Sequence, residues 1–430
     1  MPAIFAQNHY PRMTASTFTA IFVAALALCL VTRLWLAWRQ LRYVGAHREH
    51  VPPEFAQTIS LAAHRKAADY TCAKTRLSML DEIVGTAVLL PWFTLGGGIA
   101  WLLQLSAPLA GWPIARDIGV ILGFAVIMGL VSLPFSLYSV FVIEERFGFN
   151  KMSFALWLAD LVKGVVLGAA IGVPLLALIL WLLRVAGEAW WVWAWAAWVI
   201  FQSLMLIVYP TLIAPLFNKF SPLTEEAVKA RVEALLVRCG FRSKGLFVMD
   251  GSKRSSHGNA YFTGFGAAKR IVFFDTLLTR LQPPEVEAVL AHELGHFKLR
   301  HVLQRLVLAF AVSFAALALL AWVRHQPWFY AGLGVPDTEA AHYGIALLLF
   351  FLVLPLFTFL LAPVSSAWSR KHEFEADRYA AEHASAQDLA HALVKLYEDN
   401  ASTLTPDPLH SVFYDSHPPA AQRIARLQAT

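Results

Sequence analysis

Seven stretches of the chain are apolar and long enough to cross a bilayer, and they constrain the fold more than any other feature of the sequence. A membrane-spanning helix needs about 20 mostly apolar residues. Charged residues make up only 15% of the 430 residues, against about 25% in soluble globular proteins. The stretches lie at 15–38, 83–106, 117–143, 158–183, 190–216, 304–323 and 342–363. We therefore predict an all-α, multi-pass membrane protein with seven transmembrane helices.

The distribution of basic residues predicts how these helices are oriented. Eight basic residues lie between Arg33 and Arg76, whereas the tail before the first stretch holds only Arg12. Because cytoplasmic loops are enriched in Lys and Arg, we expect the N-terminus outside and the polar segments 217–303 and 364–430 in the cytoplasm. The same rule explains the net charge of +6 without nucleic-acid binding. The count and the orientation would both change if one proline-interrupted stretch were re-entrant.

The polar segments divide the chain into four parts. We expect five helices in 1–216, a catalytic segment at 217–303, two helices in 304–363 and a second polar segment at 364–430. Within the catalytic segment, an amphipathic pattern predicts a helix at 228–238, and short apolar runs predict strands at 245–250 and 270–275. Pro283 and Pro284 open a further helix. Together these elements predict a small α+β, zincin-like catalytic unit.

That last helix carries the sequence His292-Glu-Leu-Gly-His296. Residues four apart share one face of a helix, so both imidazoles can bind one Zn²⁺. Bound metal lowers the pKa of a water molecule from about 15.7 to near 7, and Glu293 is placed to take its proton. The three cysteines lie far apart in the sequence, so we expect no thiolate ligand. The pattern predicts a hydrolytic metal site with Glu293 as general base.

A catalytic zinc site needs a third protein ligand. His301 lies five residues past His296, which would turn it away from the ligand face of the helix. Glu373 and Asp377 are four apart, so Glu373 could bind the metal while Asp377 accepts a hydrogen bond from a zinc-bound imidazole. Glu375 would point elsewhere. The same residues would equally suit an ordinary charged helix start.

Two further segments are candidates for substrate binding. His417 and Arg423 flank a helix start at Pro418-Pro419 and could donate hydrogen bonds to an oxyanion or a substrate, although a surface turn is the simpler interpretation. The polar stretch 251–266 leads into the strand predicted at 270–275, and an edge strand there could pair with an extended peptide. A phosphate loop is not indicated, because the Gly-Lys-Ser/Thr ending is missing.

Taken together, the chain resembles the type I CAAX prenyl proteases along nearly its whole length. The resemblance rests on motifs at 141–150, 251–264, 289–296, 373–377 and 417–419. It implies that the seven helices enclose a water-filled chamber with the active site at its cytoplasmic end.

The resemblance also implies roles for individual residues. The zinc ligands would be His292, His296 and Glu373, and one Zn²⁺ would be bound per chain. Asp377 would lie behind them, His417 and Arg423 near the substrate or transition state, and Asn259 on the substrate-binding strand.

Family members remove the last three residues of prenylated Cys-a-a-X proteins. We therefore expect a peptide or protein substrate, with or without a prenyl group, and contact with membrane lipid. The compact loops indicate a bacterial protein of the inner membrane.

Two alternatives remain at the level of sequence. A membrane-protein quality-control peptidase of the heat-shock type shares the zinc motif but has fewer spans. A transporter with a structural metal site would use Asp160, Lys163 and the broken helices to line a pathway. A structural zinc site is closed by four protein ligands, whereas three and a base are found here, which favours the peptidase. The sequence leaves the oligomeric state open.

Overall fold

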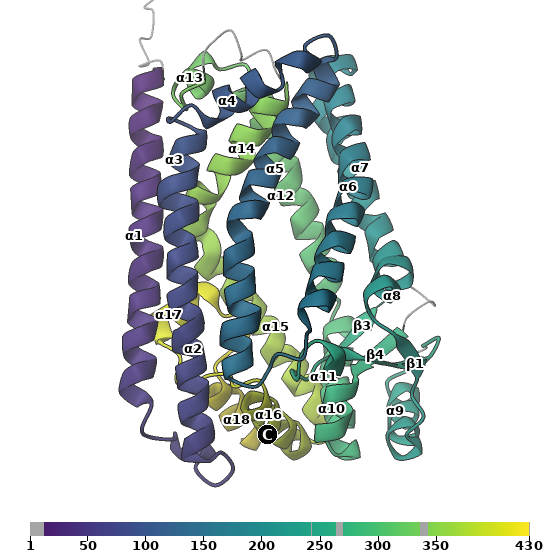
Figure 1. Ribbon diagram of the computed structural model, residues 1–430. Coiled ribbons are helices and arrows are strands. Elements are labelled where there is room, and N and C mark those ends of the chain that lie inside the picture. Colours follow the sequence, from purple (N-terminus) through teal and green to yellow (C-terminus); the bar gives the residue numbers. More distant parts are fainter. Residues whose placement is uncertain (1–12, 242, 264–269, 336–342, 430) are drawn as a thin grey trace, which may run out of the picture.

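The computed structural model describes residues 13–241, 243–263, 270–335 and 343–429. A tall helical bundle stands on a smaller, mixed polar unit (Figure 1). The bundle contains α1 (Ala15–His47), α2 (Leu61–Glu82), α3 (Leu90–Phe93), α4 (Gly98–Leu105), α5 (Pro113–Tyr138), α6 (Phe154–Val185), α7 (Trp190–Val208), α8 (Ala214–Phe217), α12 (His301–Val323), α13 (Pro327–Ala331) and α14 (Tyr343–Thr358). The polar unit contains β1 (Phe220–Pro222), α9 (Glu226–Arg238), β2 (Leu246–Met249), β3 (Ala260–Thr263), β4 (Arg270–Phe274), α10 (Asp275–Arg280), α11 (Pro283–Lys298), α15 (Ala362–His383), α16 (Ala386–Asp399), α17 (Pro408–Tyr414) and α18 (Ala420–Gln428).

The number of membrane-spanning helices agrees with the prediction, but the second span is placed differently. Among the described residues, six helices are long and apolar enough to cross a membrane, and the number is seven if the bent pair Leu61–Phe93 and Gly98–Leu105 forms one span. The predicted stretch 83–106 is thus interrupted, because the chain bends by 62° between these two helices. Gly97 has a φ of +80°, and a Cβ at Gly96 would lie 2.9 Å from the Trp92 Cα, so the glycines permit the bend.

The helix that leads into this span begins before the apolar stretch, at Leu61 of the polar helix α2. Hydropathy alone excludes this part of the helix from the membrane, because its first turns carry charged side chains. In the structure α2 packs along α1, and Arg33 of α1 donates two hydrogen bonds to the Glu82 carboxylate of α2. Contacts with a neighbouring helix therefore stabilise a helix that continues beyond the apolar stretch.

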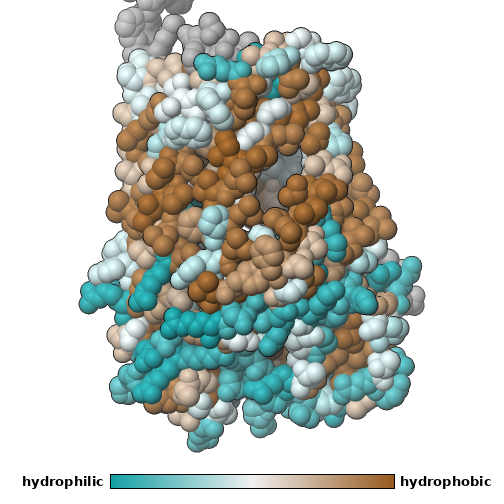
Figure 2. Space-filling view, viewed as in Figure 1, coloured by the Kyte–Doolittle hydropathy of each residue, from teal (hydrophilic) through white to brown (hydrophobic). Residues whose placement is uncertain are grey.

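Several of the bundle helices contact the rest of the protein over only a small part of their surface. Only 6% of the apolar window is buried in each of the helical runs containing α5, α6 and α7. In α6 five consecutive residues, 162–166, are exposed, and a Cβ added at Gly168 would meet nothing within 4 Å. A helix exposed on all faces cannot lie inside a solid bundle, so these helices form the wall of a hollow chamber. Outside, the bundle presents an apolar band above the polar unit (Figure 2).

The polar unit is built around a four-stranded sheet of order β1-β2-β4-β3. The predicted strands at 245–250 and 270–275 are β2 and β4, which pair in parallel, and the predicted helix at 228–238 is α9. Strand β3 pairs antiparallel with β4 at the edge of the sheet, and its outer side has no strand partner among the described residues. Helix α11 packs against α9 and shares one apolar core with the sheet and α16.

The last bundle helix continues directly into the polar unit. A single 3₁₀ turn, Phe359–Leu361, joins α14 to α15, so that Tyr343–His383 forms one helical run of 41 residues. The side chain of Glu373 is thereby carried from the end of a membrane span to the face of α11.

Candidate metal centre and active site

Helix α11 holds the histidine motif and is almost entirely enclosed by protein. Residues 285–292, 294 and 295 are all buried. The acidic residues in its first turns are neutralised, since Lys395 of α16 lies 2.7 Å from Glu285, and Arg231 and Arg238 of α9 both pair with Glu287. These contacts fix the helix from two sides and set the direction in which its histidines point.

The glycine of the histidine motif allows α15 to approach α11 closely. A Cβ at Gly295 would lie 3.0 Å from the Cα of Ala376 and 3.0 Å from the Cβ of Tyr379, which is closer than almost all real Cβ contacts. Any larger residue would push α15 away from α11. Gly295 is therefore needed to bring the carboxylates of α15 to the histidines, a role that the sequence analysis did not assign to it.

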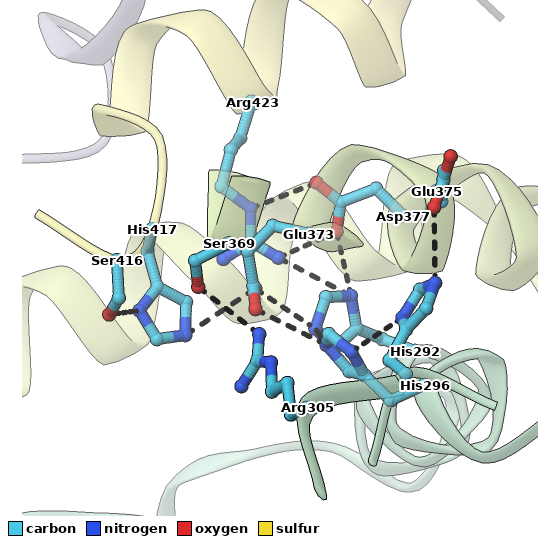
Figure 3. A network of polar contacts seen from close by, with 11 residues as sticks. His292, His296, Arg305, Ser369, Glu373, Glu375, Asp377, Ser416, His417 and Arg423 are labelled. Carbon is cyan, nitrogen blue, oxygen red and sulfur yellow. Dashed lines mark hydrogen bonds and ion pairs between the residues drawn. The ribbon is translucent and has the colours of Figure 1, made fainter. Parts of the chain in front are cut away.

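The side chains of His292, His296 and Glu373 converge on one point (Figure 3). The two Nε2 atoms are 3.3 Å apart, His296 Nε2 is 3.3 Å from Glu373 Oε1, and His292 Nε2 is 3.4 Å from Glu373 Oε2. Ligands bound at about 2.0–2.1 Å in a tetrahedral site lie about 3.3–3.4 Å from one another. Buried Glu373 Oε2 has no hydrogen-bond partner among the described residues. Both observations fit a divalent metal, with two nitrogens and a carboxylate as its donors.

Behind this cluster, a buried chain of charged groups orients His292. Asp377 Oδ1 lies 2.8 Å from His292 Nδ1, and Arg423 donates hydrogen bonds of 2.9 and 2.6 Å to the two Asp377 oxygens. Burial alone would lower the pKa of His292, but the nearby carboxylates of Asp377 and Glu373 outweigh this effect and raise the pKa to about 9. In the absence of metal His292 is therefore protonated at neutral pH.

A cavity of about 240 Å³ opens beside the cluster. Glu293, His292 and Asn259 line it on the polar side. The remaining wall is mixed: apolar side chains come from Leu277, Val289, Leu389, Leu393 and Leu396, and polar ones from Asn400, His417 and Arg423. Burial raises the pKa of Glu293 and makes its carboxylate a stronger base. The cavity therefore brings together a base, an edge strand and an apolar surface beside the three converging ligand atoms.

All the residues singled out in the sequence lie at or next to this site. His417 Nε2 is 3.4 Å from Glu373 Oε2 while its side chain is 61% exposed, which suits a group that meets a substrate. Asn259 immediately precedes the edge strand β3. Arg423 differs from the simpler sequence interpretation, because it is buried rather than part of a surface turn, and its guanidinium contacts Asp377.

The chain matches known proteins over nearly its full length. Residues 40–219 match the family described as "CAAX prenyl protease N-terminal, five membrane helices", and residues 222–430 match Peptidase family M48. The CAAX prenyl protease 1 homolog of Arabidopsis thaliana is 34% identical over 96% of this chain and 98% of its own. The human CAAX prenyl protease 1 homolog is 32% identical over 95% of each chain.

A solved structure has the same fold. The crystal structure of S. mikatae Ste24p superposes with a TM-score of 0.86, at 30% identity, and covers 95% of this chain and 99% of that one. These matches favour the peptidase over the transporter. The chain is a multi-pass membrane zinc metalloendopeptidase that belongs to the CAAX prenyl protease 1 group of peptidase family M48.

Proposed function

We propose that His292, His296 and Glu373 hold one zinc ion per chain and that Glu293 is the general base for peptide hydrolysis. The convergence of the three ligand atoms at tetrahedral spacing, with Glu373 Oε2 buried and without a hydrogen-bond partner, carries this proposal.

Zinc would supply Lewis acidity toward an attacking water molecule and the scissile carbonyl. Side chains of the protein would transfer the protons, stabilise the oxyanion and position the substrate. Glu293 takes a proton from the attacking water and passes it to the leaving amine. His417, next to Glu373 and exposed, donates a hydrogen bond to the developing oxyanion. The substrate lies extended along β3 beginning at Asn259, and the buried Arg423 acts through Asp377 to hold His292 in place.

We further propose that the substrate is the C-terminal segment of a CAAX-type protein, with a prenyl group on its cysteine. The relatives named above are CAAX prenyl proteases, and the wall of the cavity beside Glu293 includes the apolar side chains of Leu277, Val289, Leu389, Leu393 and Leu396. Such a wall suits a substrate that carries a lipid. A peptide of about three residues beyond the cut would lie toward the cavity beside Glu293.

The proposed location is the inner membrane of a bacterium, with the N-terminus outside and the catalytic unit in the cytoplasm. Arg39 of α1 pairs with Asp407 of the polar unit, so the basic end of α1 lies on the catalytic side. Single cysteines introduced at Gly111, in the α4–α5 connection, and at Glu382, on α15, test the orientation. We expect a membrane-impermeant maleimide to label position 111 in intact cells and position 382 only after lysis; the opposite pattern contradicts this orientation.

The catalytic proposal is tested with purified protein and two peptides of one sequence, farnesylated and unmodified. Glu293→Gln should lower the rate at least about 10²-fold, because general-base catalysis contributes about 10²–10⁴-fold. It should still bind zinc in the same amount as the wild type. Full activity in Glu293→Gln contradicts the mechanism. Equal cleavage of both peptides contradicts prenyl recognition and favours the quality-control role.

A further inference from the structure

The outer ring nitrogens of the two proposed metal-binding histidines have different partners. His292 Nδ1 meets the carboxylate of Asp377. His296 Nδ1 instead lies 3.0 Å from Nδ1 of His301, the first residue of α12. His301 is 1% exposed, and its own Nε2 lies 3.1 Å from Oε2 of Glu375. A second chain of contacts thus leads away from the site, through His301 to α15.

Only one placement of hydrogens satisfies this second chain when His296 presents Nε2 to a metal. His296 Nδ1 then carries the hydrogen and donates it to His301 Nδ1. His301 must in turn carry its hydrogen on Nε2, where the Glu375 carboxylate accepts it. Each group therefore fixes the tautomer of the next. The arrangement mirrors the one at His292, with a neutral imidazole inserted between the ligand and the carboxylate.

The backbone at the start of α12 holds His301 in place at an energetic cost. Arg300, which precedes it, has a φ of +59°, a left-handed conformation that residues other than glycine seldom adopt. Such a conformation is strained and persists only where surrounding contacts enforce it. This single residue turns the chain between α11 and α12 and brings His301 back against His296.

We propose that His301 and Glu375 are positioning residues for His296: they fix the tautomer and ring orientation of this ligand, as Asp377 does for His292. The inference rests on the metal site proposed above. Partners of this kind typically change metal affinity by about 10- to 100-fold.

A second metal site is the competing interpretation, because His301, His372 and Glu375 also offer ligand atoms within 4.8 Å of one another. The rings of His301 and His372, however, stack 3.9 Å apart at an angle of 3°. Ring nitrogens bind metals through lone pairs in the ring plane, and the lone pairs of two parallel rings do not converge on one ion. In this stack His372 instead packs against the face of the His301 ring, and the nitrogens at the edge of that ring remain available for hydrogen bonds.

The test measures zinc affinity by chelator competition and the visible spectrum of the Co²⁺-substituted protein. His301→Phe keeps an aromatic ring against His372 but removes the acceptor, so we expect zinc to bind about 10- to 100-fold more weakly and the Co²⁺ bands to shift. Glu375→Ala should weaken binding less, because water can reach its position, whereas Glu375→Gln keeps an acceptor and should restore wild-type binding. His372→Phe is the matched control and should bind zinc as the wild type does.

Unchanged affinity and spectrum in His301→Phe, or equal effects of Glu375→Ala and Glu375→Gln, would overturn the inference. If His301→Phe does not fold, the zinc affinities of Glu375→Ala and Glu375→Gln still test the positioning role. Glu373→Ala, measured in parallel, separates the two proposals. Wild-type zinc binding in Glu373→Ala would contradict the proposed metal site itself. Weakened zinc binding in Glu373→Ala together with wild-type binding in His301→Phe would contradict only the positioning role. Binding of two zinc ions by the wild type and one by His372→Phe would favour the second metal site.

Discussion

Helices α6 and α11 occupy opposite kinds of environment, and the more apolar of the two, α6, is the more exposed. In α6 only Leu180 and Leu183 are buried among 32 residues, whereas α11 buries ten of its 16. The bundle is a wall with lipid outside and a chamber inside, so its helices need few contacts with one another. The catalytic unit is a packed core in which each side chain sets the position of its neighbours. Substitutions should therefore be tolerated in the wall and costly around α11.

The largest difference in stability between the two regions is expected for the buried ion pair of Arg423 and Asp377. Arg423→Leu leaves the Asp377 carboxylate buried without its main partner, and breaking such pairs costs about 3–5 kcal/mol. The thermal midpoint of the detergent-solubilised protein should fall clearly. Arg65→Leu, which breaks an exposed pair with Glu49, should change the thermal midpoint little, because exposed ion pairs contribute little to stability. Equal shifts for both variants would contradict the packed-core description.

The next largest difference in stability is expected between alanine substitutions at two glycines, one in each region. Gly295→Ala forces a Cβ against the backbone of α15, and overpacking of this kind costs about 1–3 kcal/mol. Because α15 carries Glu373, zinc content should fall as well. Gly168→Ala in α6 meets nothing within 4 Å and should be neutral or slightly stabilising in a helix. The comparison fails if the two substitutions shift the thermal midpoint alike.

These glycines also show how far the sequence predicts the molecule. Periodicity identifies the spans, and the spacing of His292 and His296 identifies the ligands, because both depend on residues close in the chain. The approach of α15 to α11 depends on residues about 80 positions apart, and no local pattern reports that the Gly295 position lacks room for a Cβ.

The two largest departures from expectation have the same origin. Arg423 is hydrophilic and follows two prolines, so a surface turn is the local expectation; its burial comes from a partner 46 residues away. The bend at Gly96–Gly98 was not predicted, although the sequence has three consecutive glycines there. Glycine is needed at positions 96 and 98 because the chain passes close to Trp92. The local sequence thus identifies the functional groups, whereas their contacts depend on how distant parts of the chain pack together.

The smallest effect concerns the protonation of the metal-free site. His292 has a pKa of about 9 without metal, so below that pH a metal ion must displace a proton from it. Apparent zinc affinity should rise with pH by up to tenfold per unit, which is about 1.4 kcal/mol, and level off above about pH 9. Competition titrations with a chelator of known pH dependence measure this. In Asp377→Asn the plateau should begin at lower pH, since the hydrogen bond to the carboxylate helps to raise the pKa; an unshifted plateau would contradict this origin.

The central claim is that a membrane span delivers the third metal ligand to a helix that belongs to the packed core. The most direct measurement is the zinc content of purified, folded protein for the wild type, Glu373→Ala and Glu382→Ala, the last being an exposed glutamate on the same helix. We predict about one zinc ion per chain in the wild type and in Glu382→Ala, and almost none in Glu373→Ala, because two protein ligands do not complete a catalytic zinc site. Wild-type zinc content in a folded Glu373→Ala protein would contradict the account.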